Sequence, residues 1–210
     1  NPTFRHLVAA QLMALVGTGL ATVALGLLAW QLAGDNAGAV LGTALAIKMV
    51  AYVTLAPVAA AIAERLPRRA FMVALDLIRA GVIACLPFVT EVWQVYVLIF
   101  FLQAASAGFT PAFQAVIPDV LKDEDDYTNA LSLLRLAEDL EQLASPMIAA
   151  LLLTVVSFPV LFAGTVVGFV ASALLVVTAR LPDRAQGEPG HFWADVTKGI
   201  RIYTRTPRLR

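Results

Sequence analysis

The chain has 210 residues, of which 60% are hydrophobic and 14% charged, and its mean hydropathy is +0.79. This composition excludes an ordinary soluble domain and indicates a membrane protein. Lys and Arg total 15 and Asp and Glu total 15, so the zero net charge excludes a nucleic-acid-binding protein that relies on a basic surface. The single cysteine, Cys85, lies in an apolar segment and excludes a disulfide framework or a cysteine-based metal site.

Apolar segments recur along the chain, and each has about the 17 to 25 residues that a helix needs to cross the hydrocarbon of a bilayer. The connecting segments are short and polar or turn-forming, so no soluble domain fits between them. We therefore expect an all-α polytopic membrane protein, with a six-helix transmembrane bundle in residues 1–183 and a cytoplasmic linker in residues 184–210. The predicted helices cover residues 7–30, 39–63, 70–90, 94–117, 128–156 and 158–179.

Basic residues outside the predicted helices all fall on one side of the membrane, and the opposite connections carry only Asp35 and Glu91. Because positively charged loops stay in the cytoplasm, this asymmetry predicts that both ends of the segment are cytoplasmic and that the helices cross the inner (plasma) membrane. The basic residues on that side are Arg5, Arg65, Arg68, Arg69, Lys122 and the seven that follow position 179.

Seven charged residues nevertheless fall inside the predicted helices. Each would cost roughly 2.5 to 3.5 kcal/mol at the centre of a lipid-exposed helix, so we expect them to face protein or a water-filled cavity. Charged groups near helix ends could instead extend to the membrane surface, and for Asp76 and Arg79 this alternative stands beside burial. The seven residues are Lys48, Asp76, Arg79, Arg135, Glu138, Asp139 and Glu141.

The fifth predicted helix carries a polar stripe at helical spacing, flanked by Glu138 and Glu141. Leucines occupy the other side, which we expect to pack against neighbouring helices. Milder polar faces on the first and fourth helices complete the pattern of a substrate path through the bundle, to which Trp30, Phe109 and Phe113 could add apolar contacts. The stripe consists of Thr128, Ser132, Arg135, Asp139 and Gln142.

The charges inside the helices comprise three cations and four carboxylates, which leaves one carboxylate unpaired. We expect the remaining glutamate to exchange a proton during transport, because desolvation favours its neutral form. The pairs allowed by helix spacing and position are Asp76 with Arg79, Arg135 with Asp139, and Lys48 with Glu138 or Glu141.

Three segments resemble the major facilitator superfamily. Residues 60–69 read Ala-Ala-Ile-Ala-Glu-Arg-Leu-Pro-Arg-Arg and resemble its Gly-x-x-x-Asp-Arg-x-Gly-Arg-Arg signature, in the same loop. Residues 108–119 and 127–132 are similar to the fourth-to-fifth-span region of drug and siderophore exporters of the enterobactin-exporter and macrolide-efflux type. Residues 145–150, Ser-Pro-Met-Ile-Ala-Ala, resemble the antiporter motif Gly-Pro-x-x-x-Gly, with Ser and Ala in place of both glycines.

The resemblance implies a twelve-helix transporter with two six-helix halves and alternating access, of which this chain would be the amino-terminal half. Ser145 and Pro146 would bend the fifth helix and permit a close helix contact. The signature loop would form a cytoplasmic gate, although orientation by positive charge alone is an alternative reading of it. The gate residues would be Glu64, Arg65, Arg68 and Arg69, with Asp119 as their carboxylate partner.

The function implied is proton-coupled export of a small amphipathic compound, a drug or a siderophore, with the substrate, protons, the bilayer and a missing carboxy-terminal half as partners. Uptake or facilitated diffusion by the same fold is an alternative, and a membrane assembly subunit is a more remote one. We expect no enzymatic activity, cofactor or metal. The only histidines, His6 and His191, lie outside the predicted helices, and no glycine-rich phosphate loop occurs.

Overall fold

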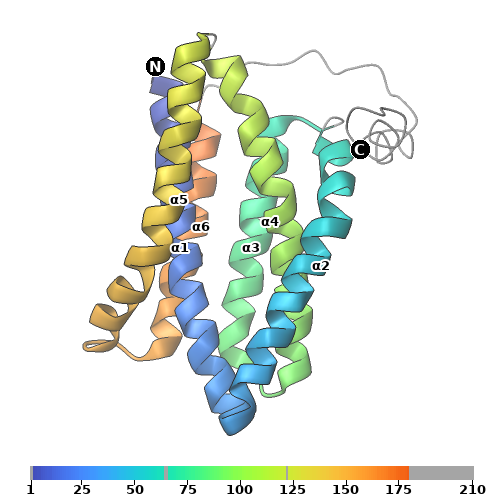
Figure 1. The fold of residues 1–210 in the computed structure, drawn as a ribbon, viewed down its shortest axis with the longest axis vertical. Helices are drawn as coiled ribbons and strands as arrows, with labels where there is room; N and C mark the ends of the chain where they lie inside the picture. The colour runs from blue at the N-terminus through green and yellow to red at the C-terminus, as the bar shows by residue number, and fades with distance from the viewer. Residues whose placement is uncertain (1, 64–65, 122, 180–210) are drawn as a thin grey trace, which may run out of the picture.

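The computed structural model describes residues 2–63, 66–121 and 123–179, which form six long α-helices joined by short turns and contain no β-strand (Figure 1). The all-α prediction is confirmed. Of the expected features, Glu64, Arg65, Lys122 and the linker 184–210 lie outside the described residues. The elements are α1 Pro2–Ala33, η1 Gly34–Asn36, α2 Ala37–Ala63, α3 Arg68–Cys85, η2 Leu86–Phe88, α4 Val92–Val120, α5 Glu124–Leu153 and α6 Phe158–Thr178.

Successive helices run in opposite directions along the bundle, so their connections gather at its two ends (Figure 1). The start of α1, the start of α3 and the start of α5 lie at one end, which we call the N-terminal end. The α1–α2 turn, the α3–α4 connection and the α5–α6 connection lie at the opposite, far end. The side chains that carry charge at the helix starts are therefore separated from the far-end connections by the full length of the bundle.

Local sequence explains where the helices begin and end. Gly34 adopts φ +53° in the η1 turn between α1 and α2, a left-handed conformation that glycine takes without a steric cost. Glu91 and Gln94 form a capping box at the start of α4. At the start of α5, the Asp123 carboxylate accepts hydrogen bonds from the backbone N–H groups of Asp125 and Asp126.

The cap at Asp123 places the start of α5 at Glu124, four residues before the start at position 128 expected from hydropathy. The acidic residues at 124–126 lie in the first turn of the helix, where the helix dipole favours negative charge. A prediction from hydropathy alone assigns these residues to a polar loop. The Asp123 cap and the helix dipole instead stabilise them as the first turn of the helix.

Four segments of the described residues are long and apolar enough to cross a membrane: Thr3–Ala63, which contains both α1 and α2, Arg68–Phe88, Val92–Val120 and Phe158–Thr178. The charged helix α5 is not among them. Large apolar side chains are exposed on the outside of the bundle, as expected for a surface in contact with lipid, among them Val53, Phe88, Leu143 and Val155.

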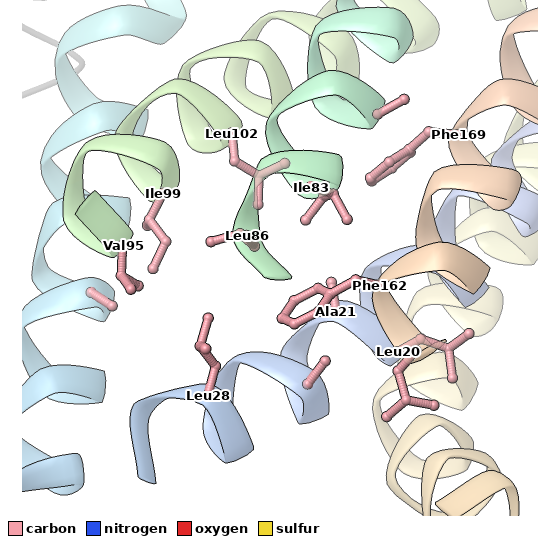
Figure 2. Close-up of a cluster of buried hydrophobic side chains, with 14 of the residues drawn as sticks. Leu20, Ala21, Leu28, Ile83, Leu86, Val95, Ile99, Leu102, Phe162 and Phe169 are labelled. Carbon is pink, nitrogen blue, oxygen red and sulfur yellow. The ribbon is translucent and has the colours of Figure 1, made fainter. Parts of the chain in front are cut away.

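The interior contains two main apolar clusters. One fills the far-end half of the bundle, where Leu28, Ile83, Leu86 and Phe162 from three helices and the η2 turn point toward one another (Figure 2). The other, which includes Phe71, Phe109 and Ile117, fills the half nearer the N-terminal end. The clusters fix the relative positions of α1, α3, α4 and α6.

Glycines bring α1 and α6 into backbone contact. A Cβ atom on Gly168 would lie 2.8 Å from the Met13 carbonyl oxygen and 3.2 Å from the Cα atom of Gly17. The Thr165 hydroxyl donates a hydrogen bond of 2.9 Å to the Gly17 carbonyl oxygen. The small residues of α6 thus permit a close contact with α1.

Candidate functional site

A cavity of about 620 Å³ lies between α1, α4 and α5. Its lining comes from the first third of α1, the last third of α4 and the first half of α5, so it occupies the half of the bundle nearer the N-terminal end. Its wall contains both polar and apolar side chains, as do sites for small amphipathic molecules. The lining residues are Gln11, Thr110, Phe113, Gln114, Tyr127, Leu131, Ser132, Leu134, Arg135, Leu136, Glu138 and Asp139.

The charged residues of the cavity wall lie at the middle of α5. This helix has 30 residues and Glu138 is its fifteenth, so about 20 Å of helix precedes the charged group. Arg135 Nη1 donates a 2.9 Å hydrogen bond to Glu138 Oε2. The Arg135 side chain is 78% exposed and that of Glu138 27%, so the pair is open to the cavity rather than sealed in a helix contact.

The pairing expected between Arg135 and Asp139 is wrong, because Arg135 contacts Glu138 instead. Both the three-residue and the four-residue spacing bring side chains together on a helix, so the sequence does not choose between these partners. Asp139 lines the cavity and is exposed. It belongs to none of the ion pairs found among the described residues.

Lys48 does not pair with Glu138 or Glu141, contrary to expectation. It is half-buried on α2, a helix that packs chiefly against α4, and it makes no ion pair within residues 2–63, 66–121 and 123–179. The separation of α2 from α5 explains the difference, because Figure 1 shows α1 and α4 between these helices. Lys48 is therefore not part of the cavity wall.

Glu141 and Ser145 turn toward α1 and away from the cavity. Ser145 is buried and its hydroxyl donates a 2.8 Å hydrogen bond to Glu141 Oε1. Both side chains press on Gly19, since a Cβ atom there would collide with the Ser145 side chain and lie 2.5 Å from Glu141 Oε1. Gln142 is exposed and is not a lining residue.

Residues 145 and 146 of the antiporter-like motif thus have different surroundings: Ser145 is buried in the contact with α1, and Pro146 is exposed. The helix continues through Pro146 to Leu153. Figure 1 shows that the last part of α5 diverges from α1.

The leucine-rich face of α5 is exposed, although it was expected to pack against neighbouring helices. Small and medium side chains, among them Ala130, Leu134 and Ala149, form the packed face instead. Helices approach each other most closely where side chains are small. The large side chains are available for lipid or a further part of the protein, with exposed fractions from 48% for Leu133 to 72% for Leu143; the others are Leu136, Leu140 and Met147.

Arg68 and Asp119 form an ion pair that joins the start of α3 to the end of α4. Arg68 Nη1 also donates a 2.7 Å hydrogen bond to the Ala115 carbonyl oxygen. Arg69 points to another helix, with Nη2 donating a 2.7 Å hydrogen bond to the carbonyl oxygen of Ala179, which follows α6. The two arginines therefore link three helices at the N-terminal end.

Asp76 and Arg79 form a second ion pair, and it is sealed inside the bundle. Asp76 has no exposed surface and Arg79 is 5% exposed, so their charged groups do not reach the membrane surface. The Ser172 hydroxyl of α6 donates a 2.8 Å hydrogen bond to Asp76 Oδ2. The Arg79 guanidinium lies 4.1 Å from the ring centre of Phe109 and 4.5 Å from that of Phe169.

Sequence reasoning found the spacing of Asp76 and Arg79 but missed their surroundings. Cation–π contacts on two sides and a hydroxyl donor compensate in part for removing the two charges from water. Ser172 is one of the few polar residues of the apolar sixth helix, and this was the only weak indication in the sequence that it contacts a polar group.

The three aromatic residues considered for the cavity have three different surroundings. Phe113 lines the cavity. Phe109 is buried beneath Arg79, and Trp30 is 62% exposed near the far end of α1. Only Phe113 therefore provides the expected apolar contact.

Gln11 adds a polar group to the cavity wall from α1. Its Oε1 atom is buried and has no hydrogen-bond partner among the described residues. A buried acceptor without a partner is costly, so a donor from a bound molecule would stabilise it. Together with the Arg135–Glu138 pair and Asp139, it equips the cavity to bind a molecule that carries both polar and apolar groups.

A bundle of long apolar helices around a charged cavity defines a multi-pass membrane protein. The sequence matches the Major Facilitator Superfamily over residues 7–209, and the chain belongs to this family. The resemblance to the superfamily, stated for residues 60–69, 108–119, 127–132 and 145–150, is thereby confirmed at the level of the family.

Curated relatives are similar over most of the chain. A protein named macrolide efflux protein A from Enterococcus faecalis is 27% identical over 182 residues, which cover 80% of this chain and 56% of the relative. A protein of the same name from Streptococcus pyogenes is 28% identical over 178 residues, which cover 81% of this chain and 44% of the relative. The chain thus spans about half the length of the curated relatives it matches. No solved structure matches it.

Proposed function

We propose that this chain is the amino-terminal half of a secondary active transporter that exports a small amphipathic compound across the plasma membrane in exchange for protons. The observation that carries the proposal is the position of Arg135, Glu138 and Asp139, halfway along α5 on the wall of a cavity. Charged groups are expensive at this depth of a membrane unless they face water or a bound molecule. Membership of the superfamily supports transport rather than a purely structural role.

The names of the relatives support efflux, and they favour a macrolide or a molecule of similar size and polarity as the substrate. The cavity supports the same class, because Phe113 and the leucines on its wall suit an apolar ring while Gln11 and the charged groups suit hydroxyl or amine substituents. A macrolide with an amino sugar could bring a cation to Asp139, which has no ion-pair partner in the described part of the chain.

The basic N-terminal end is proposed to face the cytoplasm, where the cavity of this half would receive its substrate. Arg68 and Asp119, in contact at this end, would then belong to the cytoplasmic gate. In alternating access such a gate breaks and re-forms as the two halves rock about the substrate. Glu64 and Arg65 would complete it.

The test uses the full-length transporter in inside-out vesicles, with erythromycin as the probe and a pH-sensitive dye inside. Addition of erythromycin to energised vesicles should discharge the proton gradient, and Asp139→Asn should reduce this rate at least tenfold. Asp125→Asn is the matched control, because it makes the same chemical change on an exposed turn of the same helix, outside the cavity. A discharge rate unaltered by Asp139→Asn would contradict the role of the cavity, and wild-type vesicles without a discharge would contradict proton-coupled macrolide export.

A further inference from the structure

Lys48 is a charged residue of the bundle that takes no part in the proposed substrate path. It is half-buried, lies outside the cavity wall and makes no ion pair among residues 2–63, 66–121 and 123–179. It is the twelfth of the 27 residues of α2, so about 16 Å of helix precedes it and about 22 Å follows it. The four-carbon stem of a lysine spans neither distance, so the ammonium group stays deep in the membrane.

The helices packed against α2 supply no anion at this depth. α2 packs chiefly against α4 and α1. α4 carries one acidic residue, Asp119 near its end, which pairs with Arg68, and α1 carries none. Lys48 is the only charged residue of α2 itself. Because a lone cation is costly at this depth, the counter-ion of Lys48 must come from outside the described part of the chain.

The side of α2 next to Lys48 is open. Leu45, Met49 and Val53 follow one another at four-residue intervals, with exposed fractions of 56%, 53% and 76%. Lys48 adjoins this apolar stripe, one position before Met49, and Figure 1 shows α2 at an edge of the bundle. Lipid would cover the stripe but would not neutralise the lysine. A protein surface that carries a carboxylate does both.

From this position we infer that α2 is a docking surface for the other half of the transporter, and that an Asp or Glu of that half forms an ion pair with Lys48. The inference rests on the proposed function, in which this chain is one half, and extends it by naming a contact between the halves. The curated relatives contain enough further sequence for such a partner, because the matched segment covers 56% and 44% of their lengths. A second copy of the chain fits less well, since a two-fold contact through the stripe would bring two copies of Lys48 together.

Lys48→Met in the full-length transporter tests the ion pair through the sign of its effect on folding. If a carboxylate faces Lys48, the variant leaves that acid buried without a counter-ion, and the equilibrium constant of unfolding, measured by SDS titration in mixed micelles, should rise at least about tenfold. If Lys48 faces lipid, the variant removes a costly charge and the constant should fall. Leu45→Met, one turn earlier on the same side, is the matched control and should change the constant little. An unchanged or lower constant for Lys48→Met would overturn the inference.

A double-mutant cycle then identifies the acid. Each Asp and Glu in the apolar segments that follow residue 210 is changed to Asn or Gln, alone and together with Lys48→Met. Neutralisation of the partner should recover most of the stability lost in Lys48→Met, whereas changes at acids that do not face Lys48 should be additive with it. Recovery by an acid within residues 1–210, or by no acid at all, would overturn the inference.

Photocrosslinking tests the docking surface independently of charge. Benzoylphenylalanine replaces Met49 in the full-length protein, and a protease site is inserted into the linker 184–210. After illumination and cleavage the two halves should remain joined on a denaturing gel. The same label at Leu174 on α6, which is 61% exposed, is the control and should leave the halves separate.

Halves joined from both positions, a crosslink from Met49 to a second whole copy, or a crosslink from Met49 to lipid alone would overturn the inference. A transporter that shows the Met49 crosslink and the loss of stability in Lys48→Met, but no erythromycin-driven proton flux, would instead refute the proposed export function. The contact between the halves would then still stand.

Discussion

Two ion pairs in the described part of the bundle have the same three-residue spacing on a helix but opposite surroundings. Asp76 and Arg79 on α3 are enclosed by α4 and α6, with a hydroxyl donor and two aromatic rings around them. Arg135 and Glu138 on α5 are open to a cavity. A pair enclosed by helices cannot contact a substrate. The members of an exposed pair can instead form ion pairs or hydrogen bonds with one.

This difference in burial implies different roles for the two pairs, one in stability and the other in transport. Charges enclosed by packed helices tie those helices together, because the loss of either partner leaves an uncompensated charge in the interior. Charges on a cavity wall contribute little to folding, because water already solvates them. We therefore expect changes to the α3 pair to act mainly on stability and changes to the α5 pair to act mainly on transport.

The largest effect on folding is expected from Asp76→Asn, which leaves the buried Arg79 without its counter-ion. The free energy of unfolding of the full-length protein, measured by SDS titration in mixed micelles, should fall by about 3–5 kcal/mol. The double variant with Arg79→Gln should recover part of this loss, since no charge is then left buried alone. A double variant less stable than the single one would contradict the sealed ion pair.

A smaller loss is expected from Gly168→Ala at the α1–α6 contact. The added methyl group would lie 2.8 Å from the Met13 carbonyl oxygen, so the helices must separate, at a cost of about 1–3 kcal/mol. Gly26→Ala is the control, because a methyl group there meets nothing within 4 Å. Equal unfolding free energies for the two variants would show that α1 and α6 are not in backbone contact.

A still smaller effect on folding is expected from Arg68→Gln, which removes the ion pair with Asp119 at the N-terminal end. This pair is partly exposed, so the unfolding free energy should fall by at most about 1 kcal/mol. The rate at which a thiol reagent labels a cysteine introduced at that end should nevertheless increase if the pair belongs to a gate. An unchanged labelling rate would favour the alternative that the basic loop serves only to orient the protein.

The smallest effect on folding is expected from Arg135→Gln, because the Arg135 side chain is 78% exposed. The unfolding free energy should change by less than about 1 kcal/mol, whereas erythromycin-driven proton flux should fall at least tenfold. This variant tests the comparison most sharply. A loss of stability comparable to that of Asp76→Asn, with flux retained, would reverse the roles assigned to the two pairs.

The close contacts between helices show why part of the site could not be read from the sequence. Helical spacing placed Arg135 and Asp139 on one face, and both line the cavity. The same spacing allowed Arg135 to pair with either Glu138 or Asp139. It also gave no indication that Glu141 turns toward Gly19, because that depends on the rotation of α5 against a helix more than 100 residues earlier.

Hydropathy and charge by themselves determined the all-α membrane fold and the short connections, because crossing a membrane requires long apolar helices that satisfy their own backbone hydrogen bonds. The family followed from the resemblance of short motifs. Only the tertiary structure decided which charges are sealed and which are open. Asp76 is enclosed because α6 brings Ser172 and Phe169 to α3, and Arg135 is open because α5 packs through its small side chains against α1. The rotation of each helix is set by contacts between residues far apart in the chain, and a periodic pattern within one helix carries no information about them.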